Sequence, residues 1–328
     1  MSTATAAKPR AAARHHHLRA GPDSAHWGFI DAKLKPAITI ESGDTVTIDC
    51  VSGNPEHLPP KELGAQIILP DHLEIHQKVQ KGSGNHIYTG PVYVNGAEPG
   101  DVLEVRIKDI ALRQDWGWNQ FRPLVGTLPE DFPFTQVIHI KLDRETMIAT
   151  PPWGLPIPIR PFFGQLVVAP PAAYGRQNSK EPREYGGNID CKELTAGSTI
   201  YLPVWTQGAL FSTGDGHAAQ GDGEVCGTAI ETALTGTFEF IVRKDMKLSV
   251  PRAESPTHFI TLGLHTDLDD AAKQALREML DWLEQMLGIS RGHAYAMCSF
   301  VCDMHITQLV NNVIGVHAMI DKKRLQKG

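Results

Sequence analysis

Short runs of alternating apolar and polar residues, each ended by a glycine- or proline-containing turn, fill the first three quarters of this 328-residue chain. Residues 36–51 (PAITIESGDTVTIDCV) alternate on both sides of the turn Ser42-Gly43-Asp44, and residues 100–112 (GDVLEVRIKDIAL) repeat the pattern. A period of two indicates strands with one buried face. Many short strands between frequent turns favour a sandwich or barrel over a doubly wound parallel sheet. We therefore expect a mainly β fold with a sandwich- or barrel-like core.

The character of the chain changes after Pro256. Residues 267–288 (DLDDAAKQALREMLDWLEQMLG) place apolar side chains at helical spacing, with acidic residues at the start and Gly288 as the stop. Residues 292–310 predict a second helix that turns into a final strand. The sequence thus predicts a β-rich domain over residues 25–255, which would carry the catalytic site, and a smaller α+β subdomain over 256–328 packed on its core.

Residues 115–185 are loaded with proline, glycine and aromatic side chains. Proline has no N–H to donate and restricts the residue before it, so it interrupts a regular ladder. We expect a long ordered loop here. Loops of this length inside compact domains often form the walls of binding pockets, which we favour over simple connecting material.

Composition restricts the partners and the compartment. The 31 basic and 37 acidic residues give a net charge of −6, which argues against a nucleic-acid partner. Five cysteines without paired short spacings favour a reducing, cytoplasmic location over a disulfide framework. No stretch approaches the ~18 apolar residues of a membrane span. Residues 1–24, with His15–His17 among basic and small residues, predict a flexible, solvated leader.

The most chemically loaded stretch is residues 208–232, GALFSTGDGHAAQGDGEVCGTAIET, which contains acids and a histidine but no lysine or arginine. In an extended chain Asp215 and His217 project to one side, and Asp222 and Glu224 do the same. The glycines permit tight turns that could bring the two pairs together. Crowded carboxylates repel one another, and a divalent cation relieves that repulsion. A surface loop that binds no ion remains the alternative at this point.

Further candidates lie upstream, beside other glycine turns. Asn188 and Asp190 follow a Gly-Gly pair, His86 precedes a Gly-Pro turn, and His26 and Asp31 flank residues 27–30. Asn and Asp beside glycine are also frequent turn formers, and a lone histidine is more often structural than catalytic. Near the C-terminus, Cys298 and Cys302 lie among apolar residues with His293 and His305 nearby, and we expect these cysteines to be small core residues rather than metal ligands.

Four long motifs give these residues a common context. They are HWGFIDAKLKPAITIESGDTV (26–46), TGPVYVNGAEPGDVLEVRI (89–107), GGNIDCKELTAGSTIYLPV (186–204) and GALFSTGDGHAAQGDGEVCGTAIE (208–231). Together and in this order they resemble the acetamidase/formamidase family, closely over residues 26–245 and more loosely beyond. The resemblance implies a metal-associated hydrolase that releases ammonia from small aliphatic amides, built on a mainly β scaffold and assembled as a homodimer or higher homo-oligomer.

The family's polar positions fall in this chain on His26, Asp31, His86, Asn188, Asp190, Asp215, His217, Gln220, Asp222, Glu224 and Glu231. One departure is visible at Leu166 and Val167, where the family tends to carry smaller residues. If these two side chains border the pocket, they would alter the range of substrates.

The spacing argument and the resemblance together give a hypothesis for the site. Asp190, Asp215, His217 and Glu224 are the expected ligands of a divalent metal ion, with zinc favoured by the histidine and calcium the alternative. Glu231 or His86 is the expected group that moves the proton from water to the departing nitrogen. Because a regular strand would put Glu224 and Glu231 on opposite faces, this hypothesis requires a bend, which Gly227 could provide.

Two alternatives stay open. Cys226 could be a nucleophile with a histidine as its base, but its acidic neighbours disfavour the thiolate. The chain could instead be a non-catalytic β protein whose acidic glycine loops bind metal only to hold strands together.

Overall fold

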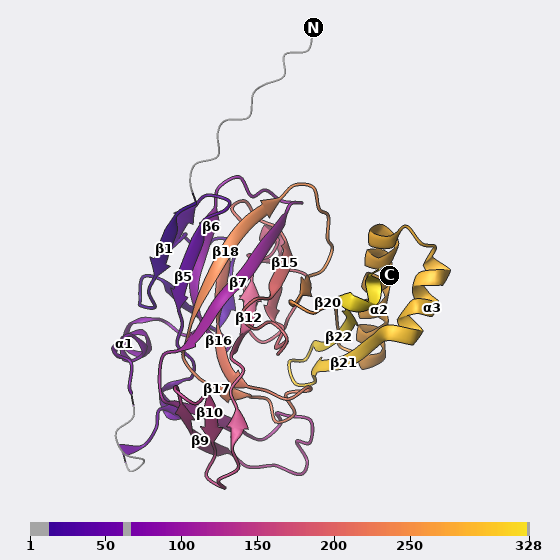
Figure 1. The fold of residues 1–328 in the computed structure, drawn as a ribbon. Coiled ribbons are helices and arrows are strands. Elements are labelled where there is room, and N and C mark those ends of the chain that lie inside the picture. The colour runs from indigo at the N-terminus through magenta and orange to yellow at the C-terminus, as the bar shows by residue number, and fades with distance from the viewer. Residues whose placement is uncertain (1–12, 62–66, 327–328) are drawn as a thin grey trace.

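The computed structural model describes residues 13–61 and 67–326, and most of the strands within them form two large sheets (Figure 1). The expectation of a mainly β fold is confirmed. The first sheet contains, in spatial order, β1 (His15–Leu18), β5 (Thr45–Asp49), β18 (Leu234–Arg243), β7 (Val102–Leu112), β15 (Thr199–Pro203), β19 (Arg252–Glu254), β20 (His258–His265), β22 (Ile314–Asp321) and β21 (Cys302–Gln308).

The second sheet is built around strand β16 (Phe211–Ala219), which pairs with β12, β17 and β6. Its main path runs β11 (Ile157–Pro158), β10 (Ile148–Thr150), β9 (Gln136–Asp143), β8 (Trp116–Phe121), β17 (Ile230–Glu231), β16, β12 (Phe162–Val167) and β14 (Gly186–Asn188). Strand β6 (Ile87–Val94) adds β2 (Ala25–Trp27) and β4 (Ile38–Ile40) to this sheet, while β3 (Phe29–Ile30) and β13 (Gln177–Asn178) pair separately.

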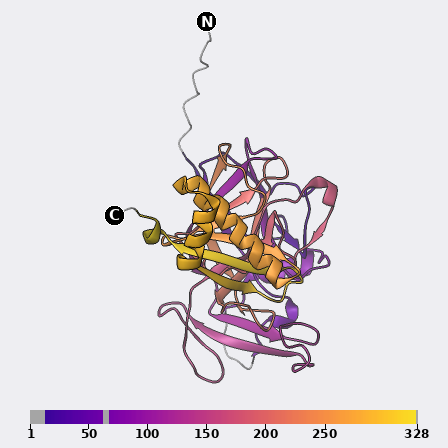
Figure 2. The same cartoon turned by 90° about the vertical axis from the view of Figure 1, so that its right-hand side faces the viewer.

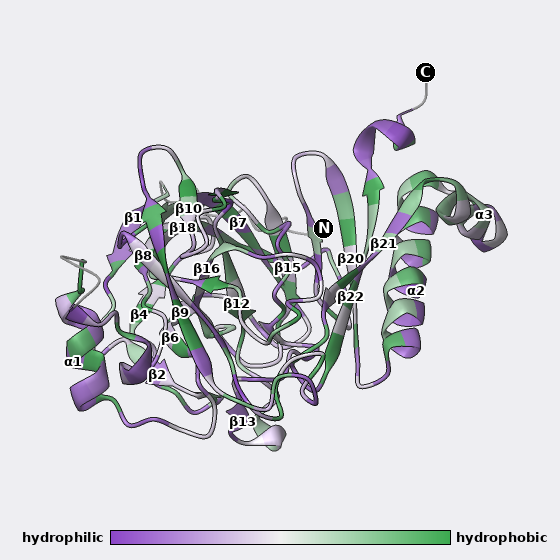
Figure 3. Ribbon diagram, turned by 90° about the horizontal axis from the view of Figure 1, so that it is seen from below, coloured by the Kyte–Doolittle hydropathy of each residue, from purple (hydrophilic) through white to green (hydrophobic). Residues whose placement is uncertain are grey.

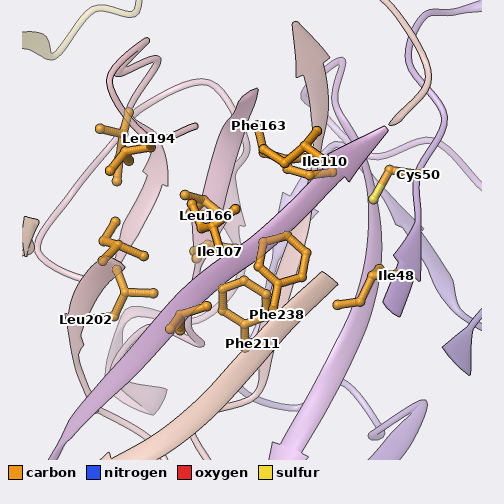
Figure 4. Packing of buried hydrophobic residues seen from close by; sticks show 14 of the residues in the cluster. Ile48, Cys50, Ile107, Ile110, Phe163, Leu166, Leu194, Leu202, Phe211 and Phe238 are labelled. Carbon is orange, nitrogen blue, oxygen red and sulfur yellow. The ribbon is translucent and has the colours of Figure 1, made fainter. Parts of the chain in front are cut away.

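The two sheets pack face to face through large apolar side chains (Figure 4). Phe163 of β12 and Phe211 of β16 meet Phe238 of β18, with ring centroids 5.5 Å and 5.9 Å apart. Ile48 and Ile107 belong to the same buried cluster. Aromatic rings at these separations add to the free energy gained by burying their area. The core therefore lies between the sheets, with β16 at its centre.

The helices cover the outer faces and edges. Helix α1 (Pro70–Lys78) lies beside β2, where His76 stacks on Trp27. Helices α2 (Leu268–Leu287) and α3 (Arg291–Val301) lie beside the C-terminal strands, as Figure 2 shows. Short 3-10 turns occupy Pro55–His57, Ala172–Tyr174 and Lys322–Leu325. None of the helices in the described ranges combines the length and the apolar composition needed to cross a membrane.

Helix α2 uses small residues to pack closely on the sheet. Gly263 of β20 lies directly under Ala271 and Ala275, and a Cβ at position 263 would collide with their backbone. Thr261 Oγ1 donates a hydrogen bond to the carbonyl of Ala275 at 2.7 Å. Figure 3 shows hydrophobic residues on α2 and on the neighbouring β20 and β22. The predicted helices at 267–288 and 292–301 are thus present. The sequence predicted one final strand after them, whereas the structure has two, β21 and β22.

Two sequence-based expectations need correction. Residues 13–24, expected to be part of a flexible leader, contain β1, which pairs in parallel with β5 because its histidines contact polar residues of that strand region. The earlier residues 1–12 of that expected leader lie outside the described ranges. Residues 115–185, expected to be one long loop, contribute β8 to β13, because proline falls between the strands rather than within most of them.

The division at residue 255 stays a prediction. It falls in the turn between β19 and β20, which pair with each other inside one continuous sheet. The C-terminal part thus shares its hydrogen-bonded ladder with the first part of the chain.

Asp44 anchors β1 and gives a test of this docking. Its buried carboxylate accepts hydrogen bonds from Arg14 N at 2.8 Å and Glu41 N at 3.0 Å, and it contacts His16 Nε2 at 3.0 Å. Burial alone would raise the pKa of Asp44, but these contacts together hold the pKa below its ordinary value. The ionised carboxylate therefore stabilises the fold above the unfolded-state pKa of ~3.9.

We expect Asp44→Asn to lower the free energy of unfolding by about 1–3 kcal/mol at pH 7, because an amide N–H then faces backbone donors. The difference from wild type should shrink as the pH falls through the depressed pKa of Asp44, where the wild-type carboxylate also takes a proton. Urea unfolding between pH 7 and pH 2 measures this. A difference that stays constant over that range would contradict the account.

Candidate active site

Five ionisable side chains meet beside β16 although they come from four separate places in the chain. Asp190 follows β14, Asp215 and His217 lie on β16, Glu224 lies in the loop after β16, and Glu231 ends β17. All five are buried. One ligand atom from each of Asp190, His217 and Glu224 lies within 4.8 Å of the others, and the same holds for Asp215, His217 and Glu231. The structure thus brings together the four expected metal ligands and one of the two expected proton carriers.

Three of the acids have left-handed backbone conformations. The φ angle is +52° at Asp190, +59° at Asp215 and +45° at Glu224. Non-glycine residues seldom adopt this region, and such conformations collect at functional sites where the surrounding structure enforces them. Here Asp215 lies between two glycines, and Gly223 and Gly227, both with positive φ, turn the chain around Glu224. The bend that the sequence hypothesis required between Glu224 and Glu231 is therefore present, with β17 limited to Ile230–Glu231.

The predicted pairing of Asp215 with His217 is confirmed. His217 Nε2 lies 3.4 Å from Asp215 Oδ2 and 3.2 Å from Glu231 Oε1, and the imidazole has no exposed surface. The second predicted pair does not form. Asp222 contacts Lys192 and His305, whereas Glu224 lies with Asp190 and His217.

Gln220 determines which nitrogen of His217 carries a hydrogen. Its side-chain Nε2 donates to the carbonyl oxygen of Asp190 at 2.8 Å, so its Oε1 faces His217 Nδ1 at 2.9 Å. An amide oxygen can only accept, and Nδ1 must therefore be the donor in this contact. A neutral His217 consequently presents the lone pair of Nε2 to the carboxylates of Asp215 and Glu231. Two acceptors facing a lone pair repel it unless a proton or a metal ion lies between them.

Within the five-residue cluster, His217 Nε2 and Asp190 Oδ1 are buried and have no hydrogen-bond partner among the residues that the structure describes. Buried polar atoms are nearly always paired, so these two require an explanation. One imidazole nitrogen with several carboxylate oxygens is a donor set that suits zinc or another first-row divalent ion. The residues present therefore fit a divalent metal ion held by Asp190, Asp215, His217 and Glu224.

The charges of the site shift its pKa values strongly. Burial would lower the pKa of His217, but the charges of Glu231 and Asp215 outweigh burial and raise this pKa well above its ordinary value. Burial, assisted by the charge of Asp190, raises the pKa of Glu224 well above the usual range. Burial also raises the pKa of Glu231. Burial acts in the same direction on Asp215, yet the charges of His217 and His86 lower its pKa overall.

Opposing shifts among neighbouring carboxyl groups are typical of sites that separate acid and base roles. Among the described residues, His217 is the one basic side chain that forms ion pairs with the acids of this cluster. The four carboxyl groups of the cluster can therefore carry more negative charge than the one histidine neutralises.

Neither Gly164 nor Asn311 was identified from the sequence, yet both shape the site. Asn311 Nδ2 donates to Asp190 Oδ2 at 2.5 Å. Asn311 lies more than a hundred residues downstream, and no local motif marks it. Gly164 of β12 leaves room for the acids, because a Cβ there would lie 2.5 Å from Asp215 Oδ2 and closer still to Asp190 Oδ1. Its place in the middle of an apolar strand, where glycine marks a close approach, is a signal that sequence reasoning could have used.

A cavity of about 80 Å³ opens onto Asp215, Glu224 and Glu231 of the acidic cluster. Its walls include His86, Asn188, Asp215, Glu224, Glu231 and Asn311 together with Ser52, His57 and Trp118. His86, the other expected proton carrier, contacts Ser179 Oγ through Nδ1 at 2.8 Å, and burial lowers its pKa. The cavity is small compared with the ~300–1,000 Å³ of drug-sized ligand sites, which limits its contents to a few heavy atoms.

Two of the remaining candidates lie outside this cavity and have structural contacts. His26 stacks on Tyr88 with a 4.7 Å centroid separation and contacts Ser212 Oγ, and burial lowers its pKa to about 4. Asp31 lies 3.5 Å from Arg176 Nε near the surface.

Cys226 lines a different pocket, of about 450 Å³, which Glu224 also borders. Its thiol lies near Asn119 and Thr228. Leu166 and Val167 are fully buried and belong to the core between the sheets. Neither side chain belongs to the walls of the 80 Å³ cavity, so neither is placed to select substrates by direct contact there.

Fold and site together define a β-sandwich protein with a buried acid–histidine centre suited to a divalent ion. The Acetamidase/Formamidase family profile matches residues 30–181 and 175–319. These two matches cover most of the chain, which therefore belongs to the acetamidase/formamidase family.

Individual relatives agree with this family. A formamidase of Methylophilus methylotrophus is 32% identical over 201 residues, covering 45% of this chain and 49% of that protein. An acetamidase structure from Bacillus halodurans superposes with a TM-score of 0.80 at 28% identity, covering 94% of this chain and 98% of the other. An acetamidase structure from Yersinia enterocolitica gives 0.83 at 29% identity, covering 96% and 94%. This chain spans less than two thirds of the length of the curated relatives that it matches.

Gly164 gives a test of the site that leaves every charged residue in place. We expect Gly164→Ala to abolish metal binding at the active site, because the new methyl group occupies the space between Asp190 and Asp215. The same change should lower the free energy of unfolding by about 1–3 kcal/mol. Metal analysis and urea unfolding measure the two effects. Gly292→Ala is the matched control, since nothing lies within 4 Å of a Cβ there. Wild-type metal content in a folded Gly164→Ala protein would contradict this geometry.

Proposed function

We propose that this protein hydrolyses small linear amides, of the size of formamide or acetamide, to a carboxylate and ammonia. The observation that carries the proposal is the 80 Å³ cavity lined by His86, Asp215, Glu224 and Glu231, which combines room for a few heavy atoms with closely spaced acids. Membership of the acetamidase/formamidase family supports the reaction class. The relatives named formamidase and acetamidase support the substrate class.

Asp190, Asp215, His217 and Glu224 would hold a divalent ion, zinc by its ligand preference and calcium as the alternative. When bound, such an ion polarises an amide carbonyl and lowers the pKa of water from its bulk value toward ~7. Gln220 supports this role, because its contact at Nδ1 leaves His217 Nε2 free to act as a ligand. Asn311 and the backbone conformations described above keep the carboxylates in place.

Glu231 is the group that we assign to proton transfer. Its Oε1 accepts a hydrogen bond from Ala229 N at 2.9 Å, which fixes the carboxylate at the cavity wall. The raised pKa of Glu231 suits a group that takes a proton from the attacking water and returns it to the amide nitrogen. The water oxygen bonds to the carbonyl carbon, the C–N bond breaks, and the nitrogen leaves as ammonia. His86, which lines the same cavity, is the alternative carrier.

The Cys226 alternative has less support. The thiol lines the larger pocket rather than the cavity with His86, Asp215 and Glu231. Its contacts are with Asn119 and Thr228, which offer no base to take the thiol proton. Assembly as a homodimer or higher homo-oligomer and a cytoplasmic location remain predictions from the sequence.

The first test is ammonia release over a graded series of linear amides. We expect formamide and acetamide to be cleaved, the rate to fall as the acyl group outgrows the cavity, and chelation to abolish activity while the circular dichroism spectrum is retained. Glu231→Gln should lower kcat by about 10²–10⁴-fold, since it removes proton transfer. Asp215→Asn and His217→Gln should lose both the active-site metal ion and the activity.

Cys226→Ala is the control and should keep the wild-type rate. Loss of ammonia release in this variant alone would favour the nucleophilic cysteine. A protein with no amidase activity whose melting temperature falls on chelation would instead be a non-catalytic metal-binding protein.

The second test concerns protons released on metal uptake. Since the charges of Glu231 and Asp215 keep His217 protonated above its ordinary pKa, a metal ion must displace that proton to use Nε2. We expect zinc affinity to fall by about tenfold per pH unit for each proton displaced as the pH drops below the raised pKa of His217. Isothermal titration calorimetry in two buffers of different ionisation enthalpy counts the protons. Binding heats that do not depend on the buffer would contradict a histidine ligand.

A further inference from the structure

A second cluster of metal-ligand side chains lies outside the candidate active site, where the C-terminal strands meet the loop after β16. His305 of β21 and His317 of β22 are directly opposite each other in the antiparallel register. Their rings are stacked, with centroids 4.9 Å apart and planes 8° from parallel. Val316 and Ala318 on either side of His317 pack in the cluster under α2. Side chains alternate along a strand, so His317 projects from the opposite face of the sheet.

Asp222 completes this cluster from the neighbouring loop. Its Oδ2 lies 3.1 Å from His305 Nδ1. One ligand atom from each of Asp222, His305 and His317 lies within 4.8 Å of the others. The three residues come from two segments more than eighty positions apart, and the fold alone places them together.

His317 supplies an independent sign that something binds here. The side chain is completely buried, and its Nδ1 contacts Thr307 Oγ1 at 2.7 Å. The other nitrogen, Nε2, has no hydrogen-bond partner among the described residues. A buried imidazole nitrogen without a partner costs free energy unless a ligand compensates for it. Thr307 thus holds the Nδ1 side of the ring. In the tautomer that carries its hydrogen on Nδ1, Nε2 is an electron-pair donor without a partner among the described residues.

We propose that Asp222, His305 and His317 form a second divalent-metal site, distinct from the acid-rich active site. Two imidazoles with one carboxylate form a nitrogen-rich donor set that suits zinc or a similar first-row ion better than calcium or magnesium. Three protein ligands leave further coordination positions for water on the side where Asp222 and His305 are partly exposed.

The surroundings give this site a structural role. Gly223 N donates to Thr307 O at 3.2 Å, and Leu309 N donates to Gly223 O at 3.0 Å. The loop residue between Asp222 and Glu224 is therefore already hydrogen-bonded to the C-terminal strand region. A metal ion shared by Asp222 and the histidine pair ties the same loop to β21 and β22 at a second point. It fixes the segment that carries Glu224 without touching the active-site cavity.

Lys192 is the charged group that competes with a metal ion at this place. Its Nζ lies 3.0 Å from Asp222 Oδ2, and its side chain is 27% exposed. A partly exposed ammonium can move into solvent when a divalent ion takes its place, since ion pairs near the surface contribute little to stability. Removing a metal ligand should weaken metal binding at this site. Removing the Lys192 charge should strengthen it, because the competitor for Asp222 is then gone.

The test is a titration of metal-free, full-length protein with Co²⁺, followed by absorption and by metal analysis after gel filtration. Wild type should bind two equivalents, and His305→Gln should bind one. Asp215→Asn, which damages only the active site, should keep the equivalent held by Asp222, His305 and His317. Lys192→Met should bind that equivalent more tightly than wild type. His293→Gln is the matched control, because this exposed histidine of α3 lies outside the cluster and its loss should leave two equivalents.

Equal metal content in folded wild type and His305→Gln would overturn the proposal, as would an Asp215→Asn protein that binds no ion. A second measurement does not depend on how the variants fold. Crystals soaked in Zn²⁺ should show an anomalous difference peak between Asp222, His305 and His317. A peak at the active site with none here would also overturn the proposal. Amide hydrolysis is not part of either readout, so the two proposals fail independently.

Discussion

The structure depends on keeping four carboxylates and one imidazole together in a buried volume from which water is largely excluded. Removing charges from water carries a large free-energy cost, and like charges at close range add to it. The protein lowers this cost with hydrogen bonds to the outer atoms of the cluster, from Asn311 to Asp190 and from Ala229 N to Glu231. The remaining negative charge faces His217 Nε2. The arrangement is therefore consistent only with a cation at its centre, either a proton or a metal ion.

Much of the fold could be predicted from the sequence because its signals are local. The alternation in residues 36–51 and 100–112 follows from one buried face per strand, and the helix at 267–288 follows from its apolar spacing and Gly288. The docking of β1 could not be predicted in this way. It depends on Asp44, Thr47 and Asp49, which are more than twenty-five residues away, and three consecutive histidines give no period by which a strand is recognised.

The candidate site shows the same division between local and distant information. Asp215 and His217 could be paired from their spacing, and Glu224 and Glu231 from the glycines that allow a bend. Asp222 could not be placed, because the conformation of one glycine decides which way it points and the partner that receives it lies in the last tenth of the chain. Asn311 and Gly164 escaped notice for a related reason, since each acts only through a contact that the complete fold creates.

The left-handed backbone at Asp190 and Asp215 restricts which residues can replace them. A substitute must satisfy a conformational filter as well as a chemical one, and among residues with a side chain Asn passes the first filter most readily. Glutamate keeps the charge but adopts this conformation less readily than the shorter Asn and Asp, and at Glu224 the glycines on either side of the loop accompany it. The backbone conformation alone therefore limits the substitutions that Asp190 and Asp215 tolerate, whatever the reaction requires of their side chains.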